Sequence, residues 1–120
     1  MVVKGENMDG ILDTIKKMLG IDPTDTSFDT DVITLINSAF MNLEQLNVGP
    51  FGGFSIKDNS AKWTDFLGSV TNQEAAKTYI YLKVKMVFDP PASSTVLEAY
   101  NRESQEVAYR LMMQAEPPSI

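Results

Sequence analysis

The chain has 120 residues, is 43% hydrophobic and has a formal net charge of -6 at neutral pH, so we expect one domain with one modest core that folds without crosslinks. It contains neither cysteine nor histidine, which excludes disulfides, thiol nucleophiles and thiolate metal ligands and removes the commonest general base at neutral pH. Its acidic charge argues against a protein that holds nucleic acid through phosphate contacts.

The first predicted helix covers residues 8–19, where apolar side chains recur at helical spacing and form one narrow stripe. We expect this helix to pack against one partner surface. Gly20 is placed to end it in a left-handed conformation, with Ile21 packing back onto the last turn. Its polar residues are expected to face solvent: Asp9, Asp13, Lys16 and Lys17.

The following segment, residues 21–31, is rich in aspartate but lacks the spacing of a calcium-binding EF-hand loop. Pro23 interrupts the segment, and the central glycine of such a loop is missing. We predict no metal here. Instead, Thr26 or Asp29 is expected to cap the next helix, with the acidic side chains complementing its positive end.

A second helix is predicted from Asp29 to Leu46, with a broad apolar arc and a polar opposite face. Met41 lies in the middle of that polar face. It is either an ordinary exposed methionine or part of a contact between subunits.

Residues 47–60 form a predicted loop with three glycines and one proline. It is not a phosphate-binding loop, because no Gly-Lys-Ser/Thr closes it and no strand precedes it. Phe51 and Phe54 either fold back onto the core or present an apolar surface to a partner. Ser60 is expected to cap a short helix that contains Trp63 and ends at Gly68.

The segment from Lys77 to Phe88 fits either a strand, by its alternation, or a helix that is apolar nearly all round. Thr71 and Glu74 match a capping box, which favours a helix that ends at Phe88 or Asp89, before Pro90. Such a helix is expected to be central and at least partly covered by a neighbouring element or subunit.

A last long helix is predicted from residues 93–95 to about Ala115, with Thr95 and Glu98 as a second capping box. The expected main face has six members: Val96, Leu97, Tyr100, Val107, Ala108 and Leu111. Charges at four-residue steps form an expected solvated ladder: Glu98, Arg102, Glu106 and Arg110. The predicted fold is an all-α bundle of four main helices plus one short helix, with a long glycine-rich loop.

Catalytic chemistry has little support in the sequence. No nucleophile has a base at a meaningful spacing, so we predict no catalytic, cofactor-binding or metal-binding residue and a non-enzymatic interaction protein. No apolar run approaches the roughly 20 residues that span a bilayer, and the N-terminus has no signal-peptide core. We therefore expect a soluble, unexported protein.

Three short segments have a distinctive sequence: Thr-x-Phe-Asp-Thr-Asp at residues 26–31, Gln-Leu-Asn-Val-Gly-Pro at 45–50 and Phe-Asp-Pro-Pro at 88–91. With the segments around them, over residues 8–115, they resemble the head-tail connector (adaptor) proteins of siphovirus-type tailed bacteriophages and prophages. None of the three is a catalytic motif.

The resemblance implies an all-α virion protein whose copies form a ring, typically twelve-fold, below the portal. The implied partners are other copies of the chain, the portal protein and a downstream stopper or tail protein. DNA would pass through the ring without specific binding, and assembly would occur in the cytoplasm of the bacterial host. Two alternatives stay open: another neck component such as a stopper or tail-completion protein, and a small protein-binding module.

The resemblance and the helical pattern together give a domain organisation and a set of contact residues. We expect a flexible N-terminus at 1–7, one connector domain at 8–115 and an extended tail at 116–120. The interface candidates are apolar residues outside the expected core faces: Met41, Phe51, Phe54, Tyr81, Tyr109, Met112 and Met113.

Overall fold

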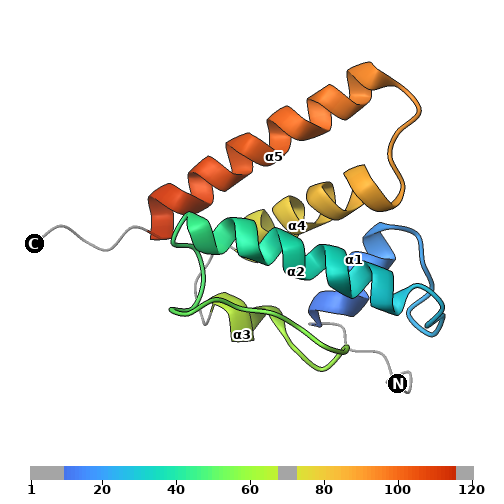
Figure 1. The fold of residues 1–120 in the computed structure, drawn as a ribbon, viewed down its shortest axis with the longest axis horizontal. Helices are drawn as coiled ribbons and strands as arrows, with labels where there is room; N and C mark the ends of the chain where they lie inside the picture. The colour runs from blue at the N-terminus through green and yellow to red at the C-terminus, as the bar shows by residue number, and fades with distance from the viewer. Residues whose placement is uncertain (1–9, 68–72, 116–120) are drawn as a thin grey trace, which may run out of the picture.

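The computed structural model describes residues 10–67 and 73–115, and these form five helices (Figure 1). The helices are α1 (Ile11–Met18), α2 (Asp29–Gln45), α3 (Trp63–Leu67), α4 (Gln73–Phe88) and α5 (Ser94–Ala115). The described ranges contain no strand, only one isolated antiparallel bridge between Gly10 and Lys62. The predicted all-α bundle is confirmed. The ends predicted to be flexible or extended, 1–7 and 116–120, lie outside the described residues, as do Gly68 and Thr71.

Helix α1 ends as the sequence predicts. Gly20 has a φ of 84°. The Ile21 N–H donates to the Lys16 carbonyl at 2.8 Å, and the Gly20 N–H donates to the Lys17 carbonyl at 3.0 Å. These two bonds are the Schellman pattern, which satisfies carbonyls that the helix leaves unpaired.

The expected solvent-facing side of α1 is wrong for Asp13 and Lys16, which are both buried. The chain after the long loop returns across this side of the helix. There the Ile11 N–H donates to the Ala61 carbonyl at 3.0 Å, and the Trp63 indole donates to the Thr14 hydroxyl at 3.2 Å. Because α1 also packs against α2 and α4, it has several partner surfaces and not the single one expected.

Helix α2 begins at Asp29, but its predicted side-chain cap is wrong. The N-cap residue is Phe28, whose side chain makes no hydrogen bond to the backbone of the first helical turn. The acidic side chains instead stabilise the preceding turns: Asp22 accepts from the Thr24 N–H at 2.9 Å, and Asp25 accepts from the Ser27 N–H at 3.0 Å. Short polar side chains favour such turns as an alternative to capping.

Helix α4 is the centre of the bundle, and the ambiguity between strand and helix is resolved as helix. It contacts α5, α2, α1 and α3, and it ends at Phe88, before Pro90, as predicted. Its buried residues are Ala76, Tyr79, Ile80, Leu82 and Val84. The expectation that this helix is central and covered is confirmed, and neighbouring elements of the same chain provide the cover. At its C-terminus, the Phe88 ring packs edge-on against Phe28 with 5.5 Å between ring centroids.

Helix α5 begins at Ser94, two residues earlier than a Thr95 cap would require. The Ser93 hydroxyl accepts the Val96 N–H at 3.4 Å, so the predicted capping box of Thr95 and Glu98 is wrong. Val107, Ala108 and Leu111 are buried as expected, together with Ser104. Val96 is exposed instead, because the N-terminal half of α5 diverges from the other helices (Figure 1).

The two phenylalanines of the loop between α2 and α3 differ in burial. The Phe54 ring packs against Phe40 and Phe66, with centroid distances of 5.1 and 5.3 Å, whereas Phe51 is fully exposed. The Asn37 amide fixes this loop, because it donates to the Ile56 carbonyl at 2.9 Å and accepts the Ile56 N–H at 2.8 Å. One phenylalanine therefore folds back onto the core and the other does not.

The short helix α3 is stabilised by Asp65 and not by Ser60. The Lys62 N–H donates to the Asp65 carboxylate at 2.8 Å, and the Ser60 hydroxyl donates to Asp58 at 2.6 Å. The helix consequently starts at Trp63, and the predicted Ser60 cap is wrong.

Gly49 offers a test of this loop. Its φ is 104°, and an added Cβ would lie 2.5 Å from Cε1 of the Phe66 ring. We expect Gly49→Ala to lower the free energy of unfolding by about 3 kcal/mol, because strain and overpacking add. In the matched control Gly52→Ala, φ is 93° with no atom within 4 Å of the added Cβ, so the expected loss is only about 1 kcal/mol. Equal losses in urea denaturation of the two variants would contradict the close packing of Gly49 on Phe66.

Candidate interaction surface

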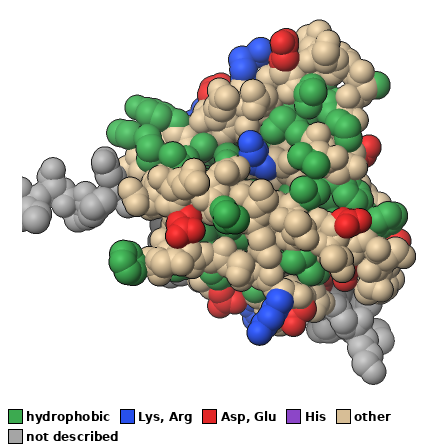
Figure 2. All heavy atoms as spheres, in the orientation of Figure 1, with side chains coloured by type: hydrophobic (Ala, Val, Ile, Leu, Met, Phe, Trp, Pro, Cys, Tyr) green, Lys and Arg blue, Asp and Glu red, His purple; other side chains and the backbone are tan. Residues whose placement is uncertain are grey.

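Exposed apolar side chains are the first candidate for a functional surface. In Figure 2 they gather over the left end of α5 and in the band between α5 and α2. Four of the seven predicted interface residues are exposed: Met41, Phe51, Tyr109 and Met113. Isolated exposed apolar residues are common, but neighbouring ones on one element indicate contact with other proteins. The contact role of these four residues stays a prediction.

The other three predicted interface residues are partly buried. Phe54 and Tyr81 pack against the core, and Met112 is half-buried on α5. Their main role in the single chain is therefore packing. Sequence reasoning missed other large exposed apolar residues, which lie in α1 or near the ends of α2, α4 and α5: Met18, Phe28, Val87 and Val96. A periodic signal could not identify them, because they lie at or near helix ends, where exposure depends on how the neighbouring elements pack.

The outer face of α5 forms a shallow hollow of about 450 Å³. This face is opposite the buried one that packs on α4, since it follows Val107 and Ala108 by about half a turn. The hollow combines charged, amide and aromatic side chains: Arg102, Gln105, Glu106, Tyr109 and Arg110. No ion pair of either arginine occurs among the described residues, so the expected ladder along this helix is absent from the structure.

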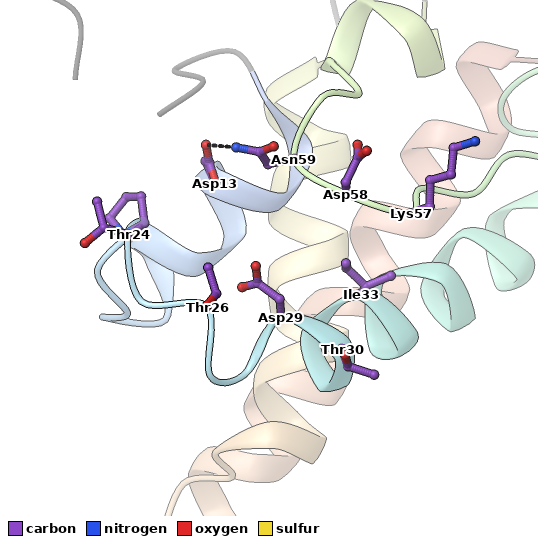
Figure 3. Close-up of a pocket in the computed structure, with 10 residues that line it drawn as sticks. Asp13, Thr24, Thr26, Asp29, Thr30, Ile33, Lys57, Asp58 and Asn59 are labelled. Atoms are coloured by element: carbon purple, nitrogen blue, oxygen red, sulfur yellow. Dashed lines mark hydrogen bonds between the residues drawn. The ribbon is translucent and has the colours of Figure 1, made fainter. Parts of the chain in front are cut away.

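A second cavity, of about 470 Å³, lies between α1, the start of α2 and the loop before α3 (Figure 3). Figure 3 shows Asp13 and Asp29 coming from two different helices and Asp58 from the loop. The lining is mostly polar: Asp13, Pro23, Thr24, Thr26, Asp29, Thr30, Ile33, Lys57, Asp58 and Asn59. We refer to this site as the acidic cavity.

Behind the acidic cavity lies a lysine that sequence reasoning placed in solvent. The Lys16 side chain is only 1% exposed; its Nζ lies 2.7 Å from Asp29 Oδ1 and donates to the Pro23 carbonyl at 3.0 Å. A buried ammonium group requires such partners, because desolvation without them is costly. This pairing connects α1 to the first residue of α2. Nothing in the local pattern marks Lys16, because its partners come from the next turn and helix.

Hydrogen bonds hold the nearby carboxylates in their ionised form. The backbone N–H and hydroxyl of Thr24 lower the pKa of Asp22, and those of Ser27 lower the pKa of Asp25. The hydroxyl and N–H of Ser60 lower the pKa of Asp58 in the same way. Such bonds favour the charged form of an acid. The region around the acidic cavity therefore remains negative at neutral pH.

The described carboxylates around the acidic cavity show no arrangement for metal binding. Within the described ranges, no group of three or more acidic side chains is arranged to hold a metal ion. The Asp13 carboxylate accepts from the Asn59 amide at 3.3 Å, and Asp29 is paired with Lys16. No helix of the described chain is sufficiently long and apolar to cross a membrane.

A small all-α bundle with exposed apolar residues and one uncovered helix face is typical of a domain that functions through contacts with other proteins. The model of the phage connector protein family matches residues 11–118. The chain therefore belongs to the phage connector protein family, and it is a structural component of the phage neck, within the virion, that interacts with other neck or portal proteins. No curated protein and no solved structure matches the chain.

The buried lysine gives a stability test. We expect Lys16→Met to lower the free energy of unfolding by about 2 kcal/mol, because it leaves Asp29, which is 27% exposed, without its cation. Lys17→Met, at the exposed neighbouring position, is the control and should change stability by less than about 1 kcal/mol. The measurement is chemical denaturation followed by far-UV circular dichroism. If the two variants lost the same stability, the buried ion pair would have no structural importance.

Proposed function

We propose that copies of this chain form a twelve-fold ring that joins the portal to downstream connector or tail proteins and extends the DNA channel. The observation that carries the proposal is the match to the phage connector family over residues 11–118, nearly the whole chain. Assembly takes place in the host cytoplasm, before the tail attaches, and the protein acts as a structural part without enzymatic activity.

A closed ring requires a heterologous interface, in which one patch of a subunit meets a different patch of its neighbour. Two features of the fold support this requirement. The C-terminal half of α5 and the connection between α1 and α2 lie at opposite ends of the molecule in Figure 1. They also differ in chemistry, because the first exposes Tyr109 and Met113 and the second borders the acidic cavity.

The net charge of -6 is compatible with a channel that DNA passes through. A protein that grips DNA neutralises phosphates with lysine and arginine and releases counterions. A ring wall with excess carboxylates repels the phosphate backbone, which allows DNA to slide. DNA is therefore cargo in this proposal, without a specific binding site.

The proposal is tested with purified chain and the portal oligomer of the phage that encodes it. We expect a stable complex in sedimentation velocity, with the connector as a ring on the portal in electron micrographs. Because assembly can require the portal as a template, the chain alone is measured in parallel. Persistent monomers that do not bind the portal would overturn the proposal.

Phe51 is the proposed contact of the long loop with the portal or the downstream protein. It is fully exposed, so we expect Phe51→Ser to weaken binding to one of these partners at least about tenfold, a loss typical of an aromatic interface residue. The melting temperature should not change. Phe54→Ser is the matched control, because Phe54 packs against Phe40 and Phe66; it should lower the melting temperature. Unchanged affinity of the Phe51 variant for both partners would exclude this contact.

A further inference from the structure

Both arginines of the sequence lie on the outer face of α5, at positions 102 and 110. They are eight residues apart, which corresponds to roughly 12 Å along a helix, and both are exposed. Although Glu98 and Glu106 lie at four-residue steps, neither arginine is paired with a carboxylate among the described residues. Both guanidinium groups are therefore available to a partner.

The α5 face also has the composition of a binding surface. Tyr109 lies between the arginines in sequence, and all three residues line the same shallow hollow. Arginine and tyrosine are enriched among the residues that dominate binding energies. Because the buried face of α5 is already occupied by α4, this outer face has no partner within the described chain.

The acidic cavity offers the complementary charge. Together with the turns that precede α2, this region contains five carboxylates, at Asp13, Asp22, Asp25, Asp29 and Asp58, and the ammonium groups of Lys16 and Lys57. Two of its carboxylates are already positioned before any partner binds, since Asp58 accepts two hydrogen bonds from Ser60 and Asp29 forms an ion pair with Lys16. Fixed carboxylates reduce the ordering cost of binding a guanidinium group, which can pair with them in bidentate geometry.

The arrangement of the two surfaces identifies the occupant. In Figure 1, α5 lies along one side of the bundle, whereas α1, the start of α2 and the loop before α3, which line the cavity, lie on the other side, so the two surfaces of one chain are apart. In a head-to-tail arrangement, each α5 face can meet the cavity of the next copy. We infer that Arg102, Tyr109 and Arg110 of one copy dock against the acidic cavity of the neighbouring copy. This inference rests on the proposed ring and specifies its subunit interface.

Charge reversal tests the pairing. We expect Arg102→Glu with Arg110→Glu to reduce ring assembly on the portal at least about tenfold, since like charges would then face each other. Asp58→Arg should reduce assembly similarly. Combining Arg110→Glu with Asp58→Arg in one chain should restore more assembly than either single change retains. Sedimentation velocity measures assembly, and circular dichroism melts establish that each variant is folded.

Lys62→Glu provides the matched control. Lys62 is exposed and lines neither the α5 hollow nor the acidic cavity, so its reversal changes the net charge by the same amount as the single change Arg110→Glu without touching the interface. We expect assembly of this variant to match that of the unmodified chain. If its assembly were reduced as much as that of the Arg110→Glu variant, net charge and not local pairing would govern assembly, and the inference would be overturned.

The outcomes separate this inference from the proposed function. If the unmodified chain forms no ring with the portal, the proposed function fails. If it forms a ring and the arginine variant does so equally well, the interface is wrong while the ring remains. Rings of the arginine variant that no longer bind the portal would place the α5 face against the portal instead. Failure of the combined charge reversal to exceed the single variants would exclude contact between Arg110 and Asp58.

Discussion

The buried ion pair of Lys16 with Asp29 is the interaction on which the functional end of the molecule depends. Lys16 is on α1, Asp29 begins α2, and the Pro23 carbonyl between them also accepts from the lysine. Because an ammonium group without partners is costly to bury, these three points are fixed relative to one another. The pair thereby positions two walls of the acidic cavity, one from α1 and one from α2.

At the other end, the attachment of α5 determines which surface is free. Helix α5 packs chiefly on α4, through Ser104, Val107 and Leu111 among others. A helix that is covered on one side by a single neighbour keeps its opposite side exposed. In an isolated protein, the exposed Tyr109 and Met113 would have no stabilising role. In the proposed ring they could be buried without any change in the fold, so that each copy would be added as a rigid subunit.

The sequence allowed the main helices to be predicted because each has a strong local signal. The boundaries of α4 and the end of α1 follow from Pro90 and Gly20, whose backbone preferences act within a few residues. The burial of Lys16 and Asp13 could not be predicted in this way, because their partners lie outside α1: Asp29 and the Pro23 carbonyl for Lys16, and Asn59 for Asp13. The different burial of Phe51 and Phe54 likewise depends on Asn37. Its amide is hydrogen-bonded to the backbone of Ile56, 19 residues later in the sequence, and thereby fixes the loop.

An acidic protein that assembles with itself must limit the repulsion between its copies. At physiological ionic strength, charges separated by more than about 8 Å are largely screened, so the groups in direct contact dominate the electrostatic free energy of the interface. In the proposed ring, both arginines on one helix face and a surplus of aspartates around one cavity would make those contacts attractive. The remaining surface keeps its net negative charge, so a subunit of the proposed ring would attract its neighbouring copies and repel passing DNA. Segregation of charge, more than its total, is therefore the property that would reconcile the proposed self-assembly with an acidic channel.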